Sequence, residues 1–252
     1  MKLVRIELGQ STHWGILEED TVYSIEGNVY GDFLKGARLC ALGETKLLAP
    51  AEPSIIVCCG RNYPRAIQRS GRPVPQEPVL FFKPPVALCN PDEDTLTLPI
   101  SNDTRFEPEL CAVMKCSAWQ VTEEEALRYV LGYTCGNDMT LYDLVRADER
   151  TTRGKGYYKS APLGPWLVTD LDPRAVRIRG IVNGVTIQDG NTAEQFFGAA
   201  RIISHISQFM PLRAGDVVYT GTPEGGRTIS AGDLLKVEVE GIGTLSNRVV
   251  VG

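Results

Sequence analysis

Residues 104–114 read TRFEPELCAVM, and this stretch raises the question on which the interpretation of the chain depends. From Leu110 to Met114 every residue is apolar, which is typical of a strand that is buried on both faces. The segment nevertheless opens with Glu107 and Glu109, which would point to one face because strand side chains alternate. Either the strand simply begins in solvent, or the two carboxylates share a hard cation such as Mg²⁺, Mn²⁺ or Ca²⁺.

The composition narrows the class of protein. The chain has 252 residues, of which 43% are hydrophobic and 23% charged, so we expect one large packed domain or a domain with a small appendage. A net charge of −5 without a basic run argues against nucleic acid as a partner. No apolar run approaches about 18 residues, and MKLVRIELGQ at the N-terminus lacks the apolar region of a signal peptide. We therefore expect a cytoplasmic protein without a membrane partner.

Cysteine and histidine usage excludes further classes of site. The seven cysteines include no C-x-x-C pair and mostly lie in apolar runs, so we expect reduced, buried thiols rather than a thiolate metal site. The only histidines are His13 and His205. Enzymes that need several histidines around a metal are therefore nearly excluded, and neither histidine is a favoured catalytic candidate.

Turn residues divide the chain into two parts. Residues 1–50 alternate short apolar groups with turns and predict a small β-rich domain. The proline-containing segment 47–54 leads into a second domain over residues 51–252. Short strands dominate this domain, with a hairpin turn at Asn183-Gly184. The whole predicts a β-rich α+β fold of rolled, mixed sheets.

Two helices and one long loop are expected in the second domain. A T-x-x-E pattern from Thr122 to Glu125 predicts a helix that ends at Gly132. A similar pattern at Thr192 predicts a helix that continues to residue 210 and buries a stripe that includes Phe196. Residues 145–161 are polar and glycine-containing, and predict a loop.

A third carboxylate favours the cation over the solvent-exposed strand end. Asp138 closes the strand-like run YTCGND, although an Asx turn or a helix N-cap would also explain an aspartate there. With Glu107 and Glu109 it completes a set of three carboxylates that can hold a divalent cation. Lys155, in the predicted loop, could supply a positive charge for an anionic ligand, or could be a solvated lysine.

Several motifs, in the same order along the chain, make residues 50–252 resemble the fumarylacetoacetate hydrolase family. The resemblance implies a rolled mixed β-sheet fold with a small N-terminal domain, a dimer, and Mg²⁺, Mn²⁺ or Ca²⁺ as cofactor. It also implies that Glu107, Glu109 and Asp138 bind the metal and that Lys155 is the active-site lysine. The motifs are SIIVCCGRNY, PVLFFKPP, RFEPEL, GYTCGNDMT, KGYYKSAPLGPWLVT, VNGVTIQDGNT, SQFMPLRAGDVVYTGTPEGG and DLLKVEVEGIGTLSNRV.

The chain departs from the hydrolases of this family where water is activated. Hydrolases carry H-x-x-E after N-Y, but here Ala66 stands at the histidine and Arg69 at the glutamate, and neither can act as a general base near pH 7. After N-D, Tyr142 stands where the hydrolases have arginine, and Val145 where they have glutamine. The pattern is similar to the half of the homoprotocatechuate-pathway isomerase/decarboxylase that lacks the H-x-x-E pair.

This branch implies a decarboxylase or isomerase of a 2-oxo, or 2-hydroxy-diene, di- or tricarboxylic acid, acting through a metal-stabilised enolate in the breakdown of aromatic compounds. Such a reaction needs no activated water. The proton could be moved by Lys155 or Tyr142, and a distal carboxylate could be bound by Arg61 or Arg69. Thr222, in the turn Thr-Gly-Thr-Pro, could contact the substrate or only shape the turn.

Two alternatives remain from the sequence. The chain could be an acylpyruvate-type C–C hydrolase or hydratase in which another residue replaces the missing pair. It could also be a non-catalytic subunit that pairs with an H-x-x-E-bearing relative. The expected partners are a small anionic oxo acid and a second copy of the chain, or such a relative in a heteromer.

Overall fold

The computed structural model describes residues 1–71 and 73–252, apart from the side chains of residues 69 and 70. A mixed sheet of twelve strands runs in the order β4-β3-β2-β1-β14-β12-β11-β17-β6-β7, with β5 beside β1 and β8 beside β14. Its strands are β1 Lys2–Leu8, β2 Ser11–Glu18, β3 Thr21–Gly27, β4 Phe33–Ala41, β5 Lys46–Leu48, β6 Ile56–Gly60, β7 Val79–Lys83, β8 Leu88–Cys89, β11 Pro108–Met114, β12 Val130–Asn137, β14 Ala161–Val168 and β17 Val217–Tyr219.

Two smaller sheets complete the β structure. A five-stranded sheet has the order β16-β15-β18-β19-β9, and β10 pairs with β13. Asn183 and Gly184 connect β15 to β16 with positive φ angles, as the predicted hairpin turn requires. The strands are β9 Thr95–Thr97, β10 Thr104–Arg105, β13 Thr140–Leu141, β15 Arg177–Val182, β16 Val185–Asn191, β18 Leu234–Val239 and β19 Gly243–Val251.

The strand of the opening question is buried on both faces, as its sequence predicts. Leu110, Ala112 and Met114 of β11 belong to the core that the large sheet shares with the five-stranded sheet. Cys111 and Val113 point to the opposite side and belong to a second core. The β-rich mixed-sheet fold is therefore confirmed, and β11 lies near its centre.

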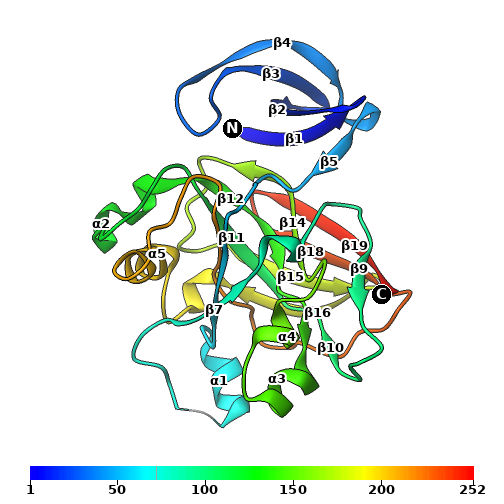
Figure 1. The fold of residues 1–252 in the computed structure, drawn as a ribbon, viewed down its shortest axis with the longest axis vertical. Coiled ribbons are helices and arrows are strands. Elements are labelled where there is room, and N and C mark those ends of the chain that lie inside the picture. Colours follow the sequence, from blue (N-terminus) through cyan, green and yellow to red (C-terminus); the bar gives the residue numbers. More distant parts are fainter. Residues whose placement is uncertain (72) are drawn as a thin grey trace.

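The N-terminal strands form a layer of their own above the rest of the molecule (Figure 1). They remain part of the large sheet, because β1 pairs with β14 through Lys2 and Leu3. No helix among the described residues is long and apolar enough to cross a membrane.

The helices are short and differ from the predicted ones. They are α1 Pro64–Ser70, α2 Glu123–Ala126, α3 Tyr142–Asp148, α4 Thr152–Lys155 and α5 Ala199–Ser207. The expected helix from Thr122 stops after one turn, and Gly132 lies inside strand β12 rather than at a helix end. The second helix begins only at Ala199, because residues 192–194 form a separate 3₁₀ turn, and Phe196 is exposed. The predicted loop 145–161 contains most of α3 and all of α4.

The register of the large sheet brings distant segments to one edge. β11 is antiparallel to both β12 and β17, so the start of β11 lies beside the ends of the other two strands. β6 is parallel to β17 and ends at the same edge. The segments that follow these ends are residues 60–63, 138–142 and 220–226, and α1, α3 and α4 gather at this end of the molecule (Figure 1).

Asp216 fixes the start of β17 from within the protein. It is 1% exposed, and its Oδ1 accepts hydrogen bonds from the backbone N–H groups of Ser54 and Ile55 and from the Ser54 hydroxyl. Its Oδ2 accepts the N–H of Arg213 at 2.7 Å. The carboxylate thus ties the linker before β6 to the turn before β17.

Asp216→Ala is expected to lower the free energy of unfolding by about 3 kcal/mol, because several buried N–H donors lose their acceptor. Urea denaturation followed by circular dichroism measures this loss. Asp172→Ala, which removes an exposed ion pair, should leave the urea midpoint almost unchanged. Equal midpoints for the two variants would show that Asp216 does not secure β17.

Candidate metal centre and adjoining cavities

Three carboxylates meet where β11 begins and β12 ends. Glu107 directly precedes β11, Glu109 lies within it, and Asp138 directly follows β12. One carboxylate oxygen of each residue lies within 4.8 Å of the others. Glu109 is 2% and Asp138 1% exposed, so these two acids are in the protein interior. The opening glutamates are therefore part of a buried carboxylate cluster rather than a solvent-exposed strand end.

Backbone hydrogen bonds hold the cluster in place. The N–H of Asp138 donates to the carbonyl of Glu107 at 2.9 Å, and the N–H of Glu107 donates to Asn137 Oδ1 at 3.0 Å. Glu109 Oε2 accepts the N–H of Gly221 at 2.6 Å. Gly221 has φ = 104°, and a Cβ there would lie 2.9 Å from the Cβ of Asn62. Glycine is required at this position for both reasons.

Two lysines supply the positive charge around the cluster. Lys155 Nζ donates to Glu107 Oε2 at 2.6 Å and to Asp138 Oδ2 at 2.5 Å. Lys83, which the sequence analysis missed, is fully buried, and its Nζ lies 2.9 Å from Asp138 Oδ1. Lys83 also donates to the carbonyls of Met139, Lys155 and Ser160. The one available signal was a lysine directly after the apolar run PVLFF, at the end of β7.

Burial and the two lysines set the charge state of the acids. Burial raises the pKa of Glu109 well above its usual value, and the nearby Asp138 raises it further. Burial also raises the pKa of Asp138, but Lys155 and Lys83 outweigh this effect and lower it below the ordinary range. For Lys155, burial lowers the pKa, but Asp138 and Glu107 outweigh this and raise it above normal. Glu109 is thus the acid in the cluster that lacks a direct lysine partner.

The cluster fits a hard divalent cation. All three side chains offer carboxylate oxygens, the ligands that Mg²⁺, Mn²⁺ and Ca²⁺ prefer. Asp138 Oδ1 is buried, and although Lys83 Nζ lies 2.9 Å away, none of the described residues makes a hydrogen bond of good geometry to it. A dication would also neutralise the desolvated Glu109. The predicted ligand set is therefore sterically and chemically able to hold a metal.

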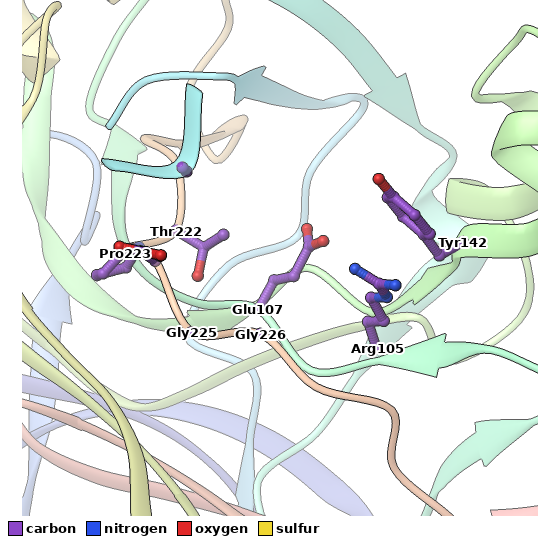
Figure 2. A pocket seen from close by; sticks show the side chains of 9 residues that line it. Arg105, Glu107, Tyr142, Thr222, Pro223, Gly225 and Gly226 are labelled. Carbon is purple, nitrogen blue, oxygen red and sulfur yellow. The ribbon is translucent and has the colours of Figure 1, made fainter. Parts of the chain in front are cut away.

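A cavity of about 270 Å³, here called the metal-side cavity, opens onto the cluster. Its lining includes the three acids, Lys155, Arg61, Arg146, Ala66, Tyr142, Val145 and Thr222. A second cavity of about 420 Å³ is lined by Arg105, Glu107, Tyr142 and Thr222, and by residues 223–226 (Figure 2). We call it the Arg105-side cavity. The two adjoin, because both are lined by Ala66, Glu107, Tyr142 and Thr222.

Comparison with known proteins agrees with this architecture. The family described as fumarylacetoacetate (FAA) hydrolase C-terminal matches residues 55–250, and the one described as Rv2993c-like, N-terminal matches residues 1–50. The chain belongs to the fumarylacetoacetate hydrolase family. The resemblance that the sequence motifs indicated is thus confirmed.

Solved structures and one curated relative show which family members are similar. A 5-carboxymethyl-2-hydroxymuconate delta-isomerase from Mycobacterium smegmatis has 35% identity and a TM-score of 0.94, with 100% of both chains covered. A 2-hydroxyhepta-2,4-diene-1,7-dioate isomerase from Mycobacterium marinum has 34% identity and a TM-score of 0.92, with 100% of this chain and 98% of the other covered. Human mitochondrial oxaloacetate tautomerase FAHD2A is 32% identical over 82% of this chain and 70% of its own length.

The structure gathers most of the predicted site residues of this family member. Besides the acids and Lys155, it places Arg61, Tyr142 and Thr222 in the lining of the metal-side cavity. The side chain of Arg69 lies outside the described residues. The prediction that Lys155 lies on a loop was wrong. It is the last residue of α4, and it is 7% exposed.

The position at which the resemblance led us to expect a histidine in hydrolases lies in the cavity wall. Ala66 presents only a methyl group to both cavities. Cys59 also lines the metal-side cavity, but burial, with a smaller effect of Glu109, raises the pKa of its thiol to about 12, so it is not a base near neutral pH. Two arginines that the sequence analysis did not select, Arg105 and Arg146, line the cavities as well.

Replacing a cluster acid is expected to weaken divalent-metal binding. Glu109→Gln removes a charged ligand, so the affinity for Mn²⁺ should fall by more than about 10-fold, which is what even indirect partners of a metal contribute. Isothermal titration calorimetry with Mn²⁺ measures the change. Glu238→Gln, a change at a strand glutamate that pairs with Arg179 in the five-stranded sheet, is the matched control and should bind Mn²⁺ like the parent. Unchanged affinity in Glu109→Gln would refute the site.

Proposed function

We propose that the chain is a divalent-metal-dependent isomerase or decarboxylase of a 2-oxo, or 2-hydroxy-diene, di- or tricarboxylic acid, with a place in the breakdown of aromatic compounds. The supporting observation is the combination of the buried cluster with a cavity wall that lacks a water-activating base at Ala66. The similar proteins named as isomerases and as an oxaloacetate tautomerase support the same reaction class.

The charge balance of the site favours an anionic ligand. When all three acids are ionised, as binding of a metal requires, Glu107, Glu109 and Asp138 contribute three negative charges, and Lys83 and Lys155 contribute two positive ones. A divalent cation changes the total from −1 to +1. The sequence analysis counted only the three acids and the metal, which leaves −1, because Lys83 was not recognised. With both lysines included, the cavity attracts a carboxylate without any further residue.

The cation and Lys155 share the chemistry in this proposal. A bound dication supplies Lewis-acid chemistry, because it polarises a 2-oxo group and stabilises the negative charge that forms there. Lys155 Nζ, kept protonated by Asp138 and Glu107, delivers a proton to the carbon that has lost CO₂ or a proton. Tyr142 lines both cavities, but its ring is stacked against Arg105, so we assign the proton transfer to Lys155.

The test is an assay of oxaloacetate with Mg²⁺ or Mn²⁺ and with chelator. Ultraviolet absorbance follows the enol form, and a coupled assay follows CO₂, so tautomerisation and decarboxylation are measured separately. Metal-dependent turnover is expected, with a loss of at least about 100-fold in Glu107→Ala, because one metal ligand and one partner of Lys155 disappear together. Glu238→Gln should retain activity, since it lies outside both cavities.

The other outcomes decide between the alternatives. Metal-dependent cleavage of an acylpyruvate that exceeds turnover of oxaloacetate would replace this proposal with a C–C hydrolase. Absence of any turnover in folded, Mn²⁺-binding protein, also with the seven-carbon 2-hydroxy-diene diacid, would favour a non-catalytic subunit.

A further inference from the structure

Arg105 and Tyr142 form a stacked pair in the wall of the Arg105-side cavity. Arg105 of β10 lies opposite Thr140 of β13, and Tyr142 directly follows β13, so this pairing brings the two residues close together. Cζ of Arg105 lies 3.7 Å from the centre of the Tyr142 ring, a cation–π contact. Figure 2 shows the guanidinium between Glu107 and Tyr142.

Asp103 holds the same guanidinium from a second direction. Arg105 Nε lies 3.1 and 3.2 Å from the two carboxylate oxygens of Asp103, and Nη2 lies 2.9 Å from one of them. Asp103 is in turn bound by the Thr228 hydroxyl at 2.7 Å, and its carbonyl accepts the N–H of Tyr142. Within the described part of the chain, Nη1 of Arg105 has no hydrogen-bond partner. The guanidinium is therefore fixed in orientation and still has N–H donors to offer.

Arg105 differs from the other arginines near the site in this fixation. Arg61 and Arg146 line the metal-side cavity, and the described residues provide neither guanidinium group with an ion pair or a hydrogen bond. Arg105 is the one lysine or arginine among the described residues that line the Arg105-side cavity. A guanidinium that is already oriented loses less conformational freedom when it binds a carboxylate, so it contributes more to affinity.

We propose that Arg105 binds the second carboxylate of the substrate and thereby selects 2-oxo acids that carry a carboxylate at the far end. The inference rests on the proposed function, which places the 2-oxo end at the carboxylate cluster. Because the two cavities adjoin at Glu107, Tyr142 and Thr222, a ligand extends from one into the other. Arg105 then takes the role that the sequence assigned to Arg61 or Arg69, and Tyr142 is its positioning residue.

The test compares two five-carbon ligands that differ in one carboxylate. Binding of 2-oxoglutarate and of 2-oxopentanoate to the Mn²⁺-loaded protein is measured by titration calorimetry, with oxalate as a probe of the metal end alone. The parent protein should prefer 2-oxoglutarate by about 10-fold or more, the usual contribution of a charge-assisted hydrogen bond. Arg105→Gln should abolish this preference and leave the affinities for 2-oxopentanoate and oxalate unchanged.

Arg174→Gln is a matched control, because Arg174 pairs with Asp172, two residues earlier, with the same contacting atoms on an exposed turn. It should behave like the parent. Tyr142→Arg in the Arg105→Gln background returns an arginine to this wall of the cavity and should restore part of the preference. Such a rescue would not follow if Arg105 only stabilised the fold.

Two results would overturn the inference. One is an equal loss of affinity for all three ligands in Arg105→Gln, which would mean a structural role. The other is a diacid preference that survives in Arg105→Gln but disappears in Arg61→Gln or Arg146→Gln. The calorimetric test measures binding and needs no turnover. Its outcome for Arg105 therefore stands even if the protein does not catalyse the proposed reaction. Equally, metal-dependent turnover with an unchanged Arg105→Gln preference would refute only the role of Arg105.

Discussion

Three carboxylates, two of them buried and each with an oxygen within 4.8 Å of the others, are the constraint on which the rest of this structure depends. Desolvated like charges cannot remain together without cations. Lys155 forms ion pairs with Glu107 and Asp138, and the fully buried Lys83 forms one with Asp138. Glu109 has no direct lysine partner among the described residues, so its charge would be neutralised by a bound metal. The strand order also builds the cluster, because the antiparallel pairing of β11 with β12 and β17 brings Asp138 and Gly221 close to the glutamates.

The cluster and the walls around it have separate tasks. The cluster supplies charge and carboxylate oxygens that can hold a divalent cation, which would suit several reactions on oxo acids, so it does not by itself fix the reaction. The cavity walls carry the residues that we expect to determine which reaction takes place. Ala66 removes a side chain that could activate water, and the Arg105–Tyr142 pair gives the adjoining cavity an oriented cation. In our proposal, the reaction and the choice of substrate therefore depend on residues of the walls rather than on the three carboxylates.

Helix prediction failed where tertiary packing outweighed local preference. The T-x-x-E pattern at Thr122 does start a helical turn, but residues 130–137 are recruited into the centre of the large sheet as β12. Burial on both faces and two neighbouring strands stabilise that segment more than a helix end could. Conversely, the polar loop expected over residues 145–161 forms helical turns, and α4 ends at Lys155, whose Nζ donates to Asp138 in the cluster.

The sequence by itself determined the strand that begins at two glutamates, the three acids of the carboxylate cluster, Lys155 and the family, because these depend on short-range patterns and on spacing within motifs. Only the tertiary structure decided the role of Lys83 and the pairing of Arg105 with Tyr142. Lys83 meets Asp138 across 55 residues of chain through the order β12-β11-β17-β6-β7, and Arg105 meets Tyr142 through the pairing of two two-residue strands. Such contacts follow from which strands become neighbours, and a single sequence read along its length does not contain that information.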